Sequence, residues 1–210
     1  MAMVRVLVIL AALVLAPPAQ AAATAAKLSA ADLADVGRIE RALNEVRSLQ
    51  AKFLQIADNG GKATGTFQMF RPGRMRLVYD PPIKDFIVSD GWFVFFWDAE
   101  LQQQSSQPIG ASLADFFLRE TIKLAGDVTI TKLVRQASMI EVSIVQTDDA
   151  GKGELTLVFE DKPLKLRSWR VVDAQGLTTI VALSDVKTGV IFPEDTFLFH
   201  APTLGKANRR

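Results

Sequence analysis

The sequence of 210 residues contains no cysteine, one histidine and one tyrosine. Without cysteine the chain has no disulfide framework, no thiolate nucleophile and no zinc site of the cysteine type. Lys and Arg number 24 against 23 Asp and Glu, so the chain lacks the basic excess that is typical of nucleic-acid-binding proteins. We therefore expect neither a nucleic-acid partner nor a redox or metal function that depends on thiols.

Motifs of catalysis are also missing. The single histidine, His200, lies near the end of the chain, and no Gly-x-Ser-x-Gly sequence accompanies it. Neither a Walker loop nor a Gly-x-Gly-x-x-Gly motif occurs. The acid pairs Asp148-Asp149 and Glu160-Asp161 fall in turn sequences, where solvation explains them better than glycosidase chemistry does. We expect no catalytic residues, no metal site and no cofactor, and an enzyme is the least favoured reading.

Residues 1–21 have the pattern of a cleaved secretory signal peptide. Arg5 precedes an apolar run over residues 6–15 that is shorter than the ~20 residues a membrane span needs. Pro17-Pro18 follows, and Ala19-Gln20-Ala21 offers small residues at the cleavage site. The alternative, a permanent N-terminal anchor helix, is less favoured. We expect export, and a single domain over residues 22–210 with no net charge.

The mature chain opens with helical periodicity. Ser29 is a suitable N-cap, and Asp32 stands three residues later as in a capping box. The apolar residues that follow at spacings of three and four are Leu33, Val36, Ile39, Leu43, Val46 and Leu49. This pattern predicts one amphipathic helix of about five turns.

Further along the chain the period changes to two. Alternation predicts strands over residues 64–70, 74–79, 85–90, 92–97, 101–105, 128–134, 139–145, 153–160, 165–172 and 177–186. Short gaps between successive strands favour an antiparallel meander. About ten or eleven strands are too many for a flat sheet, so the sequence predicts a mainly β fold, with some α, built as an open and strongly curved antiparallel half-barrel.

Residues 112–124 return to helical spacing between two predicted strands. Their apolar residues, which we expect on one side of a second helix, include Leu113, Phe116, Phe117, Leu118 and Ile122. Both helices would rest on the concave face of the sheet as a lid. Because a lid must open at small cost, we expect few strong polar ties between it and the sheet.

The 13 phenylalanines are consistent with a large apolar interior, which is either a filled core or a hollow beneath the lid. In the hollow reading, the residues expected to line an acyl-binding cavity are Phe67, Met69, Met75, Leu77, Phe86, Val88, Phe93, Phe95, Leu155, Leu157 and Phe159. Arg74 and Arg76 alternate with this set, and we expect them on the outer face of the sheet.

Several short sequences, read in order, resemble a known family. They are Phe53-Leu54-Gln55, Gly65-Thr66-Phe67, Arg71-Pro72-Gly73-Arg74-Met75-Arg76, Tyr79-Asp80-Pro81-Pro82, Val88-Ser89-Asp90-Gly91, Phe96-Trp97-Asp98-Ala99-Glu100-Leu101 and the ending Phe197, Phe199 and Pro202. Each is weak alone, but their order and spacing over residues 30–202 resemble the periplasmic outer-membrane lipoprotein carrier family, LolA.

The resemblance implies a half-barrel covered by a helical lid. It also implies a periplasmic carrier that takes acylated lipoproteins from an inner-membrane ABC transporter and delivers them to an outer-membrane acceptor, if one is present. By the same resemblance, Arg71 would reach lid carbonyl groups and latch the empty form. We expect a monomer. A carrier of another lipid and a lipoprotein-sensing regulator on the same fold remain as alternatives.

Overall fold

A computed structural model describes residues 23–110 and 113–202; the predicted signal peptide lies outside the described residues. The first element is the helix α1 (Ala30–Glu45). Ser29 is its N-cap, and the reciprocal capping box with Asp32 is present, as the sequence predicted.

The apolar series of the sequence runs past the end of α1. Val46 is the extended C-cap, and Leu49 already belongs to the first strand. Leu33, at the start of the series, is 58% exposed. The helix is therefore shorter than predicted, because Leu49 continues the three-residue spacing of the helix although it belongs to the strand.

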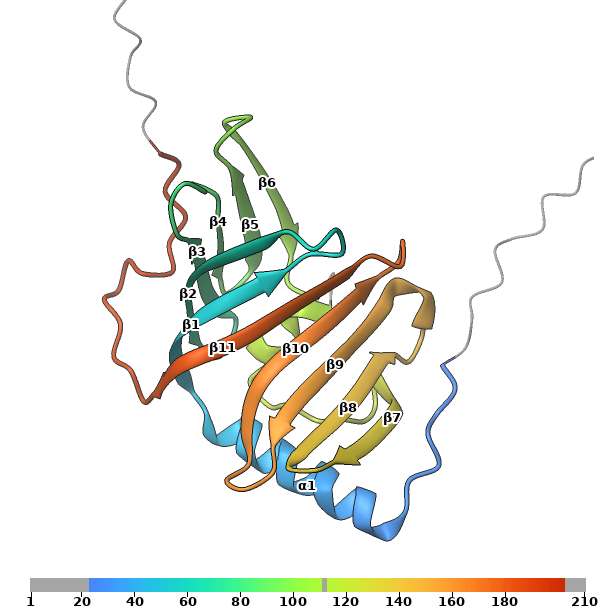
Figure 1. The fold of residues 1–210 in the computed structure, drawn as a ribbon. Helices are drawn as coiled ribbons and strands as arrows, with labels where there is room; N and C mark the ends of the chain where they lie inside the picture. The colour runs from blue at the N-terminus through green and yellow to red at the C-terminus, as the bar shows by residue number, and fades with distance from the viewer. Residues whose placement is uncertain (1–22, 111–112, 203–210) are drawn as a thin grey trace, which may run out of the picture.

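Within residues 23–110 and 113–202, eleven strands form one antiparallel sheet (Figure 1). They are β1 (Ser48–Ile56), β2 (Lys62–Phe70), β3 (Arg74–Tyr79), β4 (Phe86–Asp90), β5 (Phe93–Asp98), β6 (Gln103–Pro108), β7 (Val128–Gln136), β8 (Met139–Gln146), β9 (Gly153–Glu160), β10 (Lys165–Asp173) and β11 (Thr178–Thr188). Their order is β6-β5-β4-β3-β2-β1-β11-β10-β9-β8-β7, so the sheet is open, with β6 and β7 at its edges. The predicted mainly β, antiparallel fold and its number of strands are confirmed.

Strand β1, in the middle of the sheet, was not predicted from the sequence. It pairs with β2 on one side and with β11 on the other. Its buried residues Leu49, Ala51 and Phe53 alternate as a strand requires. The sequence pattern does not reveal β1 because Leu49 continues the helical spacing of α1. The start of the strand therefore falls inside the predicted helix.

The predicted second helix is wrong in its extent. Among the described residues 113–124, only 113–118 are helical, as the short 3-10 helix η1 (Leu113–Leu118), and residues 119–124 have no regular structure. The N–H groups of Ile122 and Leu124, which a longer helix would use internally, instead donate to Asn44 and Glu40 of α1, at 2.8 and 2.7 Å. Side chains of α1 therefore replace the helical hydrogen bonds of this segment.

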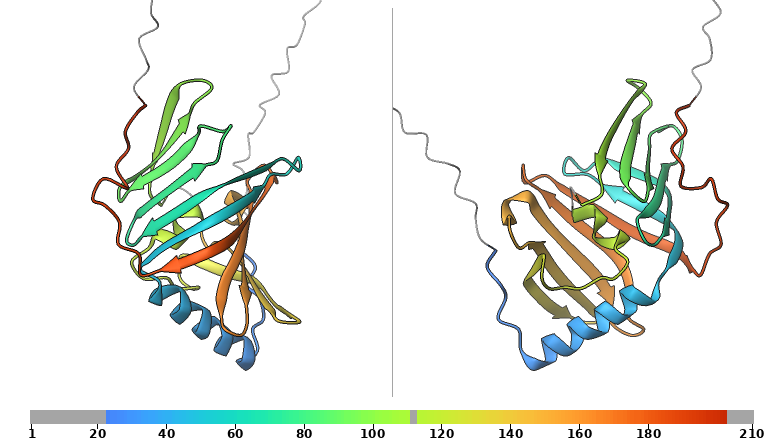
Figure 2. Two further views of the ribbon diagram at one scale, coloured as in Figure 1. Left: turned by 60° about the vertical axis from the view of Figure 1, so that its left-hand side comes forward. Right: turned by 180° about the vertical axis from the view of Figure 1, so that it is seen from behind.

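The sheet curves around the main core, and α1 crosses one of its open ends while η1 lies against the concave face (Figure 2). Phe116, Phe117 and Leu118 of η1 are buried in this core together with Ile39 and Leu43 of α1. A second, smaller cluster lies on the opposite, convex face. Both expected lid segments thus pack on the sheet, although one of them is not an α-helix.

Two glycines give opposite expectations for the same substitution. A Cβ on Gly65, in β2, would lie 2.1 Å from the carbonyl oxygen of Val78 and 2.6 Å from the Phe53 ring. A Cβ on Gly37, in α1, would meet only the end of the Arg41 side chain, at 3.5 Å. Gly65→Ala should lower the free energy of unfolding by about 1–3 kcal/mol through overpacking.

Gly37→Ala is the matched control, and it should raise the free energy of unfolding by about 1 kcal/mol because alanine favours the helix. Urea unfolding of the two variants measures both values. Equal shifts of the same sign would contradict the packing described here.

Candidate functional site

A cavity of about 320 Å³ lies between the C-terminal half of α1 and the concave side of the sheet. Most of its lining is apolar, and the residues that form it are Ala42, Leu43, Val46, Leu49, Phe67, Met69, Arg71, Phe117, Ile122, Phe159, Leu164, Lys165, Leu166, Arg167, Trp169, Leu183, Asp185, Val186 and Thr188. The volume is at the lower end of the ~300–1,000 Å³ that is usual for ligand pockets.

The predicted cavity residues fall into three groups. Phe67, Met69 and Phe159 line the cavity. A further group belongs to the same core but lies away from the cavity wall, and it consists of Met75, Leu77, Leu155 and Leu157. The concave face is therefore filled with side chains around these four residues, and the cavity lies under the end of α1.

The third group is a correction: Phe86, Val88, Phe93 and Phe95 point to the convex face. The β3–β4 register pairs Leu77 with Ile87 and Arg76 with Val88. Ile87 therefore faces the core, and its neighbours in β4 share the outer face with Arg76.

Contacts on the convex face agree with that register. The guanidinium of Arg76 lies over the Phe86 ring, 5.3 Å from its centroid. Phe86 packs with Val88 and Trp97 there, and Phe95 stacks on Phe199 with centroids 5.1 Å apart. The prediction failed because both faces of β4 and β5 are apolar, so alternation of polarity could not choose the inner one. The outer placement of Arg76 was right.

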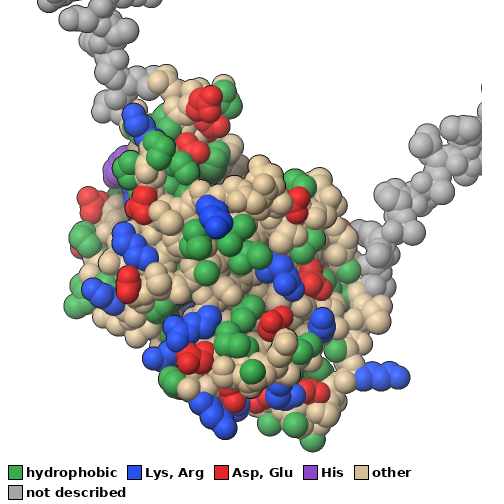
Figure 3. Space-filling view, viewed as in Figure 1, with side chains coloured by type: hydrophobic (Ala, Val, Ile, Leu, Met, Phe, Trp, Pro, Cys, Tyr) green, Lys and Arg blue, Asp and Glu red, His purple; other side chains and the backbone are tan. Residues whose placement is uncertain are grey.

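On the face of the molecule that carries β9, β10 and β11, basic, acidic and hydrophobic side chains are interspersed (Figure 3). The cavity also has polar lining residues from these strands, namely Lys165, Arg167 and Asp185. The cavity therefore joins an apolar interior to a charged rim at the surface.

Arg71 lies in the turn after β2 and is buried, with 3% of its surface exposed. Its Nε donates to the carbonyl of Val46 at 2.9 Å, and its Nη2 donates to the carbonyls of Leu43 and Val46. Its Nη1 donates to the carbonyl of Arg119 at 3.4 Å. One guanidinium thus connects the end of α1 with the segment that follows η1.

The end of a helix suits this guanidinium. The last carbonyl groups of α1 lack helical partners and carry the negative end of the helix dipole, and the last turn of α1 contains no basic residue of its own. Burial lowers the pKa of Arg71, with a smaller contribution from the nearby Arg47. The charge is therefore desolvated, and backbone carbonyls are its partners.

The turn that holds Arg71 is itself fixed. Gly73 has φ +76°, and its N–H donates to the carbonyl of Leu118 in η1 at 2.7 Å. The Ser89 hydroxyl donates to the carbonyl of Gly73, also at 2.7 Å. A Cβ on Gly73 would lie 2.8 Å from Gly91 Cα, so both the backbone angle and the space require glycine here.

Polar side chains join α1 to the segment after η1. Asn44 donates to the carbonyl of Ile122 and accepts from its N–H, both at 2.8 Å. Arg47 donates to the carbonyl of Glu120 at 3.2 Å. Phe117 of η1 and Ile122 of the segment after it line the cavity, whereas Leu118 and Phe116 of η1 are buried, Phe116 fully. Leu113, the remaining predicted lid residue, is among the residues whose side chains the structure does not describe.

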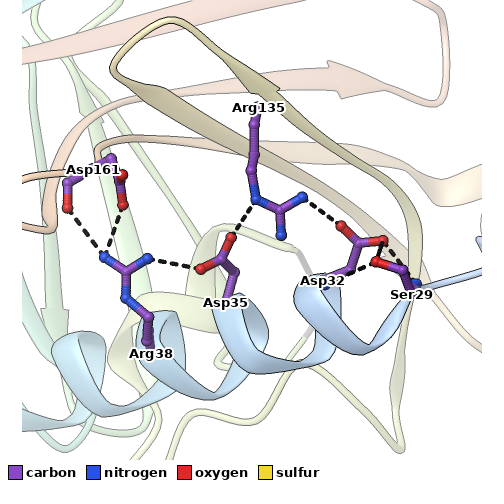
Figure 4. Close-up of polar contacts among 6 residues, drawn as sticks. All are labelled: Ser29, Asp32, Asp35, Arg38, Arg135 and Asp161. Atoms are coloured by element: carbon purple, nitrogen blue, oxygen red, sulfur yellow. Dashed lines mark hydrogen bonds and ion pairs between the residues drawn. The ribbon is translucent and has the colours of Figure 1, made fainter.

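The N-terminal half of α1 is held by an ion-pair network (Figure 4). The carboxylate of Asp35, a residue that is 7% exposed, pairs with Arg38 at 2.7 Å and with Arg135 of β7 at 2.5 Å. Arg135 also pairs with Asp32 at 2.6 Å, and Arg38 with Asp161 at 2.8 Å. The expectation of few strong polar ties between lid and sheet is therefore wrong for this half of the helix.

The open sheet, the lid and the apolar cavity together define a half-barrel binding protein. Within the described ranges the structure holds no group of three or more residues suited to a metal ion. In the same ranges it has no helix with the length and hydrophobicity that a membrane crossing requires.

Comparisons with known proteins give the family. The family model of the outer membrane lipoprotein carrier protein LolA matches residues 44–200. An outer-membrane lipoprotein carrier protein of Methylococcus capsulatus is 26% identical over 182 residues, which are 83% of this chain and 87% of the relative. One of Dechloromonas aromatica is 30% identical over 183 residues, which are 81% and 86% of the two chains.

Among solved structures, an uncharacterized conserved protein from Thermus thermophilus is similar, with a TM-score of 0.49 and 11% identity, covering 81% of this chain and 95% of that one. The chain belongs to the LolA family of outer membrane lipoprotein carrier proteins. Carriers of this family bind and transport without catalysis, which confirms the expectation that the chain is not an enzyme.

The network around α1 predicts a dependence of stability on pH. Hydrogen bonds from the Ser29 backbone and from Arg135 lower the pKa of Asp32 to about 2. Because the folded-state pKa lies below the unfolded one, the ionised carboxylate stabilises the fold above pH ~4, and this contribution is lost as the pH falls towards 2. Asp32→Asn should therefore destabilise the protein at pH 7 and make little difference at pH 2.

Urea unfolding at pH 7, 4 and 2 measures this difference. Asp148→Asn is the control, because Asp148 is exposed and makes no ion pair or side-chain hydrogen bond with the described residues. A difference between wild type and Asp32→Asn that stays constant from pH 7 to pH 2 would contradict the assignment.

Proposed function

We propose that this protein, after removal of residues 1–21, is a periplasmic carrier that binds the acyl chains of lipoproteins released from the inner membrane and delivers them to the outer membrane. The observation that carries the proposal is the apolar cavity under α1, beside which Arg71 in the turn after β2 donates hydrogen bonds to the end of α1 and to Arg119. The names of the relatives, which are outer-membrane lipoprotein carrier proteins, support it.

Acyl chains need such a surface because each buried methylene contributes ~0.8 kcal/mol. Exposing a long acyl chain to water therefore costs about 10 kcal/mol of free energy or more. Apolar contacts are not directional, so the cargo can leave without breaking a specific polar bond. Flexible and aromatic side chains such as Met69 and Phe117 can adapt to mixed acyl groups.

The closed cavity of about 320 Å³ is small for cargo with three acyl chains. Loading therefore requires α1 and the segment after η1 to move away from the sheet. Arg71 opposes that movement through hydrogen bonds to both pieces. The latch favours the empty closed form and so promotes release, since cargo must offset the hydrogen bonds that it breaks.

The proposed route also requires partners. We propose an inner-membrane lipoprotein-releasing ABC transporter as the donor and an outer-membrane acceptor, where one is present, as the recipient. The carrier itself would act as a monomer and bind no nucleic acid. Mass spectrometry of material that copurifies from periplasm tests the cargo: acylated lipoproteins support the proposal, and free lipids or a signalling partner in their place would contradict it.

Arg71→Leu tests the latch. The variant should bind a triacylated lipopeptide but release it to acceptor membranes at least about tenfold more slowly. The reason is that the closed form loses hydrogen bonds to a charged group, which contribute about 1.5–3 kcal/mol each. Binding is followed by lipopeptide fluorescence and release by transfer to vesicles.

Arg74→Leu removes the same charge at the start of β3, just after that turn, where the guanidinium lies over the Phe70 ring, and should release cargo at the wild-type rate. Arg71→Lys keeps the charge without the fork of donors and should fall between the two. Transfer by Arg71→Leu at the wild-type rate would show that Arg71 is not a latch.

A further inference from the structure

The sheet splits between β10 and β11. Residues 168–172 of β10 pair with residues 178–182 of β11, and no pairs continue beyond them. Residues 165 and 166 at the start of β10 pair with β9, whereas residues 183, 184, 187 and 188 of β11 pair with β1. The two strands diverge towards α1, as Figures 1 and 2 show.

The cavity reaches this split from inside. Its lining includes Lys165, Leu166 and Arg167 on one side of the split and residues 183, 185, 186 and 188 on the other. A register shift between Leu166 and Ser168 places Leu166 opposite Phe159 and Trp169 opposite Leu157, so both face inwards. A slender ligand could pass between the strands without breaking a ladder pair.

The ionic residues that line the cavity are mostly basic: Arg71, Lys165 and Arg167 against Asp185. Arg71 is buried, and its side-chain partners are carbonyl groups. Arg167 pairs with Glu160, whereas Lys165 is exposed and has no carboxylate within ion-pairing distance among the described residues. An anion beside the exposed Lys165 gains a modest ion-pair attraction, so an anion at the rim is favoured.

We propose that the closed form binds a single-chain lipid with an anionic head group, with the chain in the cavity and the head group at Lys165 in the split. A volume of about 320 Å³ suits one chain. Such a ligand leaves the Arg71 hydrogen bonds in place. This activity goes beyond carriage of lipoproteins, and it makes free single-chain lipids competitors for the same cavity.

Calorimetric titration tests the proposal with probes that share a twelve-carbon chain and stay below their micellar concentrations. Dodecanoate and dodecyl phosphate should each bind with one-to-one stoichiometry. Both should bind several-fold more tightly than 1-dodecanol and at least about tenfold more tightly than dodecyltrimethylammonium. The tighter of the two anions identifies the source as a fatty acid or a lysophospholipid. No binding of either anion, or equal affinity for the cation, would overturn the proposal.

Lys165→Gln should weaken dodecanoate binding about threefold, as expected for an exposed ion pair, and leave dodecanol binding unchanged. Lys132→Gln makes the same charge change on the edge strand β7, away from the cavity lining, and should have no effect. An equal loss in both variants would refute a specific role for Lys165.

Amide hydrogen exchange distinguishes binding to the closed form from opening of the lid. Saturation with dodecanoate should leave exchange at residues 40–47 unchanged, and faster exchange there would contradict binding to the closed form. The two proposals fail separately: a protein that binds triacylated lipopeptide but no dodecanoate refutes only this inference, and the reverse result refutes only the carrier function.

Discussion

The Arg71 guanidinium donates hydrogen bonds to the last carbonyls of α1, and the proposed opening of the cavity depends on breaking them. Those carbonyls need donors, and α1 has no basic side chain in its last turn to provide them. The donor comes instead from the turn after β2, which Gly73 and Ser89 fix in place. Because the same guanidinium reaches Arg119, the helix and the segment after η1 are held by one group.

The two halves of α1 are held in different ways. The first half is tied to β7 and to the turn after β9 through Asp35, Arg38 and Arg135, which are side chains that pair with opposite charges. The second half covers the cavity with apolar residues and depends on Arg71. In the proposed carrier, an acyl guest that pushes on the second half would break the Arg71 contacts while the ion pairs keep the helix attached to the sheet.

Much of the fold could be predicted from the sequence, because alternating polarity is strong wherever one face of a strand is buried and the other is wet. The prediction failed at three places for identifiable reasons. Strand β1 follows α1 without a break in apolar spacing. Strands β4 and β5 are apolar on both faces, so the sequence pattern could not show that Ile87, and not Phe86, faces the core. Residues 119–124 obtain hydrogen bonds from α1, which no local pattern reveals. The role of Arg71 was predicted only through the family resemblance. The basic residues at the rim of the cavity come together because β10 and β11 diverge, and no local sequence pattern predicts that divergence.

The proposed carriage of lipoproteins requires an acyl guest to displace the end of α1 from Arg71. Amide hydrogen exchange of the protein loaded with a triacylated lipopeptide, compared with the empty protein, measures this most directly. Exchange should become faster at residues 40–47 and 119–124 on loading and stay unchanged at residues 30–36, where the ion pairs hold the helix. Stoichiometric loading with unchanged exchange at residues 40–47 would contradict it.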